Sequence, residues 1–142
     1  MDAVTEALEP RTRANYVAAP EYFLLTQACR LVNDAFADGG HGCYLVGSAC
    51  RTKDYRDVDV RLILEDAYFD ALFGTMHALQ CNPRWVLLCL AISRHLQQAS
   101  GLPVDFQIQR MTDANREHSD DERQPLGMFH DMRPHEPYPG GG

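Results

Sequence analysis

Residues 43–64 read CYLVGSACRTKDYRDVDVRLIL, and their pattern is the most informative in the chain about its fold. Its first four residues, 43–46, form a short apolar run that is typical of a strand, and Gly47-Ser48 interrupts it. Over residues 57–64 the side chains alternate between two faces. One face carries Val58, Val60, Leu62 and Leu64, and the other carries Asp57, Asp59, Arg61 and Ile63. The stretch therefore predicts two strands separated by a turn and a short connection.

A helix precedes this stretch, and a third strand follows it further along the chain. Apolar residues recur at helical spacing over 21–37, and Asp38-Gly39-Gly40 is predicted to end that helix with a left-handed C-cap. Residues 103–109 alternate again, with Val104, Phe106 and Ile108 on the apolar face. We therefore expect a third strand there, with Asp105 on the opposite face.

Two further helices are predicted between the second and third strands. Asp66 is a plausible N-cap for a helix that runs to about Leu79. Asn82 is predicted to cap the next helix, which carries Pro83 at its first position and ends near Ser100, before Gly101. The first half of this second helix is apolar all round, so we expect it to be buried on more than one side. Either the C-terminal segment or a second subunit is expected to cover it.

The order helix, strand, strand, helix, helix, strand is typical of a small α+β domain. We expect a small mixed β-sheet with helices packed on one face. Residues 1–20 are predicted to form an N-terminal arm and residues 21–133 a single domain, with one helical turn or short helix within 111–122. Residues 134–142 are rich in proline and glycine and are predicted to be a disordered tail.

Charge and cysteine content exclude several classes of protein. The chain carries 20 acidic and 13 basic residues, a net charge of −7, which disfavours binding of long nucleic acid or of an anionic membrane. No two of the five cysteines have C-x-x-C spacing, so a zinc ribbon and a thioredoxin-type motif are unsupported, and free buried thiols are expected. No secretory signal is recognised, and the apolar stretch 85–92 is too short to span a bilayer. We expect a cytoplasmic protein with no membrane partner.

Three carboxylates in strand context point to metal chemistry. Asp57 and Asp59 stand two apart on one strand, so they project from the face that does not carry the core residues. Neighbouring carboxylates repel each other, and a bound cation removes that repulsion. Asp105 converges on the pair if its strand lies beside theirs. Because hard oxygen ligands suit Mg²⁺ or Mn²⁺, we predict that Asp57, Asp59 and Asp105 bind one of these metals.

The turn at Gly47-Ser48 is a candidate phosphate site. Glycine allows close approach to the backbone, and the amides that follow it can face an anion. Arg51 and Lys53 follow the turn, and Arg61 shares the face of the first two aspartates, so all three are candidate nucleotide-binding residues. The alternative for these basic residues is an ordinary surface salt bridge, and the alternative for the carboxylates is an exposed acidic sheet face.

The pattern hydrophobic-Gly-Ser, spacer, Asp-hydrophobic-Asp and a later strand Asp resembles the DNA polymerase beta-type nucleotidyltransferase superfamily. The matching residues are Gly47, Ser48, Asp57, Asp59 and Asp105, and the resemblance covers about residues 22–110. It implies the nucleotidyltransferase fold and transfer of a nucleoside monophosphate from a nucleoside triphosphate to a hydroxyl, with release of pyrophosphate. It also implies that the Gly-Ser turn holds the triphosphate, that the first two aspartates bind two metal ions, and that the third helps to activate the acceptor.

The resemblance leaves the partner and the acceptor open. The spacer between Ser48 and Asp57 is shorter than the family usually shows, and few residues remain after Asp105 for a helical recognition module. The acceptor is therefore expected to be a small molecule or a protein hydroxyl, with a homodimer or a separate helical partner protein as alternatives. A non-catalytic nucleotide- or protein-binding module on the same fold, such as an antitoxin-like partner subunit, is the rival interpretation.

Overall fold

The computed structural model describes residues 15–75, 78–118 and 122–128. Within them, four strands form one mixed sheet in the order β3-β2-β1-β4. The central strands are β1 (Gly40–Val46) and β2 (Val58–Leu64), which pair in antiparallel fashion. Strand β3 (Val104–Arg110) runs parallel to β2, and β4 (Gln124–Leu126) pairs antiparallel with β1. The predicted α+β class and mixed sheet are confirmed, and they are compatible with a small polymerase beta-like fold. The fourth strand was not predicted.

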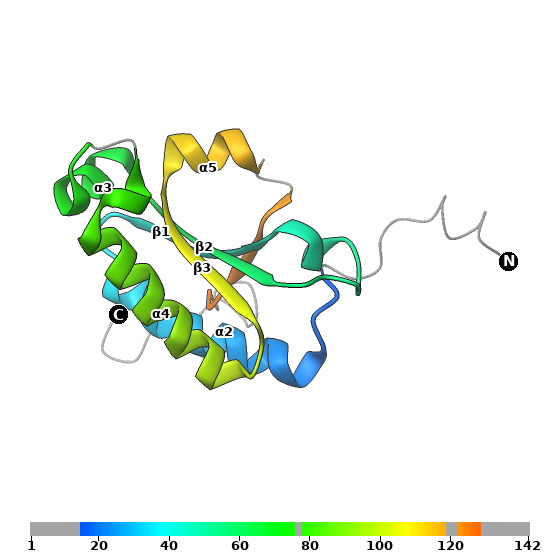
Figure 1. The fold of residues 1–142 in the computed structure, drawn as a ribbon. Helices are drawn as coiled ribbons and strands as arrows, with labels where there is room; N and C mark the ends of the chain where they lie inside the picture. Colours follow the sequence, from blue (N-terminus) through cyan, green and yellow to red (C-terminus); the bar gives the residue numbers. More distant parts are fainter. Residues whose placement is uncertain (1–14, 76–77, 119–121, 129–142) are drawn as a thin grey trace, which may run out of the picture.

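Two long helices, α2 (Ala19–Ala35) and α4 (Pro83–Ser100), cover one face of the sheet (Figure 1). Short α5 (Met111–Glu117) lies on the opposite side, over the end of the sheet (Figure 1). The alternation of β2 explains this arrangement, because one of its faces is wholly apolar and must be covered. The side chains of that face are completely buried: Val58, Val60, Leu62 and Leu64. On the other face, Val46 and Ile63 are buried, whereas Asp59 and Arg61 are only partly buried.

Helix α4 also covers the outer edge of β3. Three of its polar side chains, spaced by multiples of four residues, project toward that edge. Trp85 Nε1 donates to the Ile108 carbonyl at 2.9 Å, Ser93 Oγ accepts from the Phe106 amide at 3.1 Å, and Gln97 Nε2 donates to the Val104 carbonyl at 2.9 Å. These contacts satisfy main-chain groups that an edge strand otherwise leaves unpaired. The strand that carries Asp105 is therefore held on both sides.

The helix following β2 is shorter than predicted. Helix α3 spans Asp66–Phe73 and ends at Gly74, whose φ of +81° turns the chain away. The predicted end at Leu79 is therefore wrong, and Leu79 lies instead in the 3₁₀ turn η2 (Leu79–Cys81). Asp66 makes no capping hydrogen bond in α3, because its carboxylate instead accepts from the amide and hydroxyl of Thr112 on α5.

The predicted left-handed cap at Asp38-Gly39-Gly40 is also wrong. Helix α2 ends at Phe36, where φ is −117°, and neither glycine has a positive φ. Gly39 is required for a different reason, since a Cβ at this position would overlap the ring of Tyr68. By contrast, the cap predicted at Asn82 is confirmed: its side chain accepts from the amides of Arg84 and Trp85.

The first half of α4 is not buried all round within the described residues. Cys89 and Leu96 face the core, but Leu87 and Leu90 are 67% and 65% exposed. Helix α2 adds exposed leucines of its own, Leu24 and Leu31. Within the described residues this half of α4 is therefore partly exposed, and its cover by the C-terminal segment or a second subunit stays a prediction.

The cysteines and the two ends of the chain were also the subject of predictions. Four of the five cysteines are buried and none is in a disulfide, as expected, but Cys81 is exposed. Residues 1–14 of the predicted arm and the whole predicted tail, 134–142, lie outside the described residues. In the described ranges, no helix has both the length and the apolar character needed to cross a bilayer.

Candidate functional site

The turn after β1 is a 3₁₀ helix, η1 (Gly47–Cys50), and it is firmly held. Ala49 and Cys50 are buried in the core, and the Ala49 carbonyl accepts from the Tyr16 amide at 2.8 Å. The Ser48 carbonyl accepts from the Arg51 and Thr52 amides, both at 2.9 Å. The sequence folds this way because small residues at 47–49 permit a tight turn directly after a buried strand.

Gly47 lies directly against the carboxylate of Asp59. Its φ is +82°, and a Cβ at this position would overlap Asp59 Oδ2 and come within 3.4 Å of Cγ. The register of the sheet produces this contact, because Val46 and Asp59 are partners in the β1–β2 ladder. The Gly-Ser turn and the second aspartate, predicted separately from the sequence, are therefore one site.

Asp105 lies beside Asp59 on the neighbouring strand. The two residues are register partners in the parallel β2–β3 ladder, where adjacent strands are about 4.8 Å apart. Asp57 precedes β2 and is exposed, and the Asp105 side chain is 45% exposed. The adjacency that the sequence interpretation required, β3 beside β2, is present in the sheet.

The electrostatics of Asp59 reflect this crowding. Burial raises the pKa of Asp59 above its usual value, and the carboxylates of Asp105 and Asp57 raise it further. Arg61 and, to a smaller extent, His118 lower the same pKa and so partly oppose these effects. An additional positive charge beside this carboxylate would stabilise its ionised form.

Arg61 already supplies part of that charge. Its Nη1 donates to the backbone carbonyl of Asp105 at 2.8 Å and to that of Val60 at 3.0 Å. Its Nη2 lies 3.7 Å from Asp105 Oδ2, and its side chain is only 11% exposed. Among the described residues, its Nε is buried without a hydrogen-bond partner. Arg61 is thus held against Asp105 rather than projecting freely from the sheet.

His118 is a neighbour of the site that the sequence interpretation did not identify. It follows α5, its amide donates to the Ala114 carbonyl at 2.9 Å, and it is one of the residues that lower the pKa of Asp59. Sequence reasoning missed it because it stands alone after a short helix, with no periodic or motif partner. Only the placement of α5 over the sheet brings it toward the carboxylates.

The other predicted basic residues lie further out. Arg51 and Lys53 are exposed on the connection between η1 and β2. In the described ranges, no ion pair joins either of them to the three aspartates. Ser48 is half-buried in η1 itself. The structure therefore groups Gly47, Ser48 and the aspartates, and leaves the two basic side chains at the rim.

The chemistry of the donors fits a hard divalent cation. Asp59 and Asp105 on one sheet face, and Asp57 just before β2, supply oxygen ligands, and the pKa of Asp59 is raised first by burial and then by the two neighbouring carboxylates. As the side chains stand, no three His, Cys, Asp or Glu residues in the described part of the chain are close enough together to hold one metal ion. Joint coordination by Asp57, Asp59 and Asp105 therefore requires side-chain rotation, and Asp57 and Asp105 are exposed enough to rotate.

Comparison with known proteins gives no match: no protein-family model, no curated protein and no solved structure corresponds to the chain. The likeness to nucleotidyltransferases is carried by five motif residues and the sheet that joins them. What the site does is therefore inferred from the residues of this chain.

Proposed function

We propose that this chain is a metal-dependent nucleotidyltransferase of the polymerase beta type. It moves a nucleoside monophosphate from a nucleoside triphosphate to an acceptor hydroxyl and releases pyrophosphate. One observation supports this most directly: the Asp59 carboxylate occupies the space where a Gly47 side chain would lie, and Asp59 is the register partner of Asp105. A phosphate-accommodating turn and two carboxylates from different strands are thus adjacent.

Asp57 and Asp59 would hold Mg²⁺ or Mn²⁺, with Asp105 beside them. A metal bound there would neutralise charge on the triphosphate and lower the pKa of the attacking hydroxyl. The turn at Gly47-Ser48 receives the β- and γ-phosphates, and Arg51 and Lys53 at the rim add positive charge to the approach. Gly47 has no side chain to stand between the phosphates and the Asp59 carboxylate.

Asp105 acts on the acceptor. Its carboxylate is exposed enough to reach a hydroxyl, while Arg61 donates a hydrogen bond to the backbone carbonyl of this residue and lies 3.7 Å from one of its carboxylate oxygens. Asp105 accepts the proton as the acceptor oxygen bonds to the α-phosphorus. The bond between that phosphorus and the bridging α–β oxygen breaks, and both electrons leave with pyrophosphate. Arg61 is therefore a positioning residue in this scheme.

Labelled nucleoside triphosphates, Mn²⁺ and a cell lysate test the proposal. The wild-type protein should release pyrophosphate and label a product, and Asp59→Asn should abolish both without unfolding the protein. Asp38→Asn is the matched control, because Asp38 is exposed and precedes β1, whereas the site lies beyond the other end of that strand. Full metal-dependent activity in Asp59→Asn would show that the assignment is wrong.

The rival function is a non-catalytic nucleotide- or protein-binding subunit, and one observation favours it. Leu24, Leu31, Leu87 and Leu90 are exposed on α2 and α4, the face away from the aspartates. Clusters of exposed apolar side chains are typical of interaction surfaces. Calorimetric titration with nucleotide and Mg²⁺, followed by a pyrophosphate assay, separates the two: binding without turnover on any acceptor supports the rival. Light scattering shows whether the partner is a second copy.

A further inference from the structure

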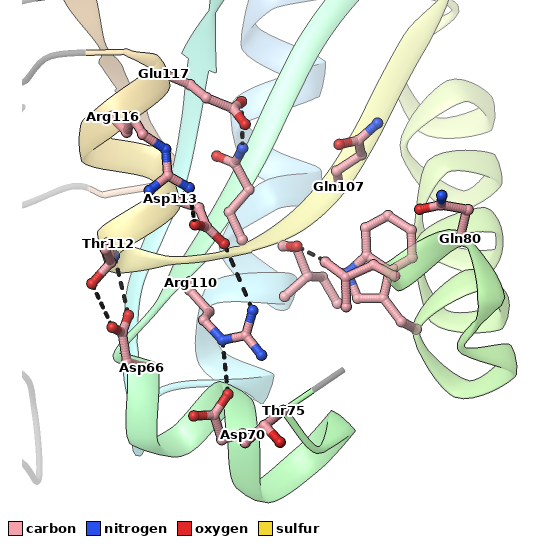
Figure 2. A pocket seen from close by; sticks show the side chains of 14 residues that line it. Asp66, Asp70, Thr75, Gln80, Gln107, Arg110, Thr112, Asp113, Arg116 and Glu117 are labelled. Atoms are coloured by element: carbon pink, nitrogen blue, oxygen red, sulfur yellow. Dashed lines mark hydrogen bonds and ion pairs between the residues drawn. The ribbon is translucent and has the colours of Figure 1, made fainter. Parts of the chain in front are cut away.

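A cavity of about 900 Å³ opens beside the candidate site, along the second half of β3 (Figure 2). Its walls come from separate parts of the chain: α3 supplies Asp66 and Asp70, η2 supplies Gln80, and β3 supplies Gln107. Figure 2 shows these side chains facing a common space, with α5 closing it on one side. This volume suits a small molecule rather than a protein surface.

The walls of the cavity are held in place by internal contacts. Arg110 Nε donates to Asp70 Oδ1 at 2.7 Å, and its Nη1 lies 3.7 Å from Asp113 Oδ2 (Figure 2). The same guanidinium stacks over the Phe69 ring, 4.5 Å from its centroid. The Thr112 amide donates to Asp66 at 3.1 Å, which ties α5 to α3. A site built this way needs little ordering when it binds a ligand.

The cavity begins one strand repeat from the proposed acceptor-activating residue. Gln107 lines it, and Gln107 and Asp105 project from the same face of β3, about 7 Å apart along the strand. Asp105 does not itself line the cavity, so a bound molecule must extend about one strand repeat beyond Gln107 to present a hydroxyl to Asp105. The opposite end of the site, at Gly47, is reserved for phosphates in the proposed mechanism.

The charged side chains that line the cavity favour some classes of ligand over others. Among the described residues, four carboxylates and two guanidinium groups line it, an excess of two negative charges. That balance repels the triphosphate and attracts ammonium groups. Amide and hydroxyl side chains, including those of Gln80, Gln107 and Thr112, supply both donors and acceptors for neutral hydroxyls. We infer that this cavity is the acceptor site and takes a small hydroxyl-bearing molecule that carries amino groups. This inference rests on the proposed transfer activity.

The test uses three disaccharides with the same β-1,4-linked skeleton and different charge. These are the glucosamine dimer, neutral cellobiose and acidic cellobiouronic acid. Trp85 is the single tryptophan of the chain and lines the cavity, so its fluorescence reports occupancy without nucleotide or metal. The glucosamine dimer should bind at least about three-fold more tightly than cellobiose, and the acid least of all. Absence of saturable binding, equal binding, or preference for the acid overturns the inference.

Two substitutions at one position should shift that affinity in opposite directions. Gln80 is exposed at the rim, so Gln80→Glu and Gln80→Lys are compatible with the fold. The first should tighten binding of the glucosamine dimer by about three-fold and the second should weaken it by about three-fold. Gln98→Lys is the matched control, because Gln98 is exposed near the other end of α4 and should change nothing. A shift of the same size in the control would overturn the assignment.

A transfer assay then separates this inference from the proposed function. Asp59→Asn should bind the glucosamine dimer as the wild type does, because Asp59 does not line the cavity. With labelled triphosphate and Mn²⁺, the wild type should label the bound dimer, and Asp59→Asn should not. Binding without labelling, while lysate products are labelled, overturns the acceptor assignment alone. No labelling of any acceptor overturns the proposed transfer activity.

Discussion

Replacing Gly47 with alanine tests the contact on which the candidate site depends. With φ at +82°, an L side chain there costs about 1–2 kcal/mol. The new Cβ would also overlap Asp59 Oδ2, so the carboxylate must leave its position. Forcing that side chain off its preferred rotamer adds about 0.5–1.5 kcal/mol. The expected loss of unfolding free energy is therefore about 1.5–3.5 kcal/mol.

Gly101→Ala is a closely matched control. Its φ is +76°, in the left-handed region and close to that of Gly47, but a Cβ there has no neighbour within 4 Å. Both substitutions also change the entropy of the unfolded chain equally, so this effect cancels in the comparison. Gly101→Ala should cost only the free energy of holding an L residue in the left-handed backbone conformation, about 1–2 kcal/mol. The difference between the two variants isolates the contact with Asp59.

Urea unfolding, followed by the fluorescence of Trp85, measures both losses. The difference should vanish when the two glycine variants are repeated in an Asp59→Ala background, because the overlapping carboxylate is then gone. Gly47→Ala should also weaken binding of nucleotide with Mn²⁺, whereas Gly101→Ala should not. Equal losses in the two variants with Asp59 present would refute the proximity of the turn to this aspartate.

Three further predictions concern the rest of the domain. Ser93→Ala removes the hydrogen-bond partner of the Phe106 amide on the edge of β3 and should lower the free energy of unfolding in urea by about 1–3 kcal/mol. A loss below about 0.5 kcal/mol would show that water replaces the hydroxyl fully. Iodoacetamide at pH 8 should label exposed Cys81 first and leave Cys89 unlabelled, since burial raises the pKa of Cys89 to about 11; equal labelling by mass spectrometry would contradict this. Hydrogen bonds from Thr112 hold the pKa of Asp66 below its usual value in the folded protein. These bonds therefore stabilise the fold fully above the ordinary pKa of aspartate, and the stabilisation is lost as the pH falls through the lowered pKa of Asp66. The stability gap between wild type and Thr112→Val should therefore narrow on acidification, and a widening gap in urea midpoints would count against it.

The strands and their faces were predictable from the sequence because alternation is a local property. The four apolar residues of β2 are buried as predicted, and Asp59 and Asp105 lie on the opposite face. Helix caps were predicted where a side chain makes the cap, as at Asn82. The predicted caps were wrong where contacts with distant segments determine the conformation. Gly39 makes room for the ring of Tyr68, and the Asp66 carboxylate accepts a hydrogen bond from α5.

The candidate site was predictable only in part. Its carboxylates and its turn follow from spacing and alternation within 43–64 and 103–109. The contact between Gly47 and Asp59 depends on the ladder register, and the acidic cavity depends on α3 and α5 meeting at the end of β3. The approach of His118 and the pairing of Arg61 with Asp105 are likewise tertiary. Spacing and alternation within one segment do not indicate which distant segments it contacts in the folded chain.

The cover that α4 provides over β3 has a consequence for assembly. A strand with occupied carbonyls and amides on its outer edge offers no main-chain template to another chain, so the sheet cannot be extended there. At the opposite edge, β4 is three residues long and contains Pro125, which has no amide to donate. Assembly through this domain would therefore be mediated by side chains. The exposed side chains of α2 and α4 would then determine which partner is bound. Single substitutions there can change the choice of partner without disturbing the sheet that carries the aspartates.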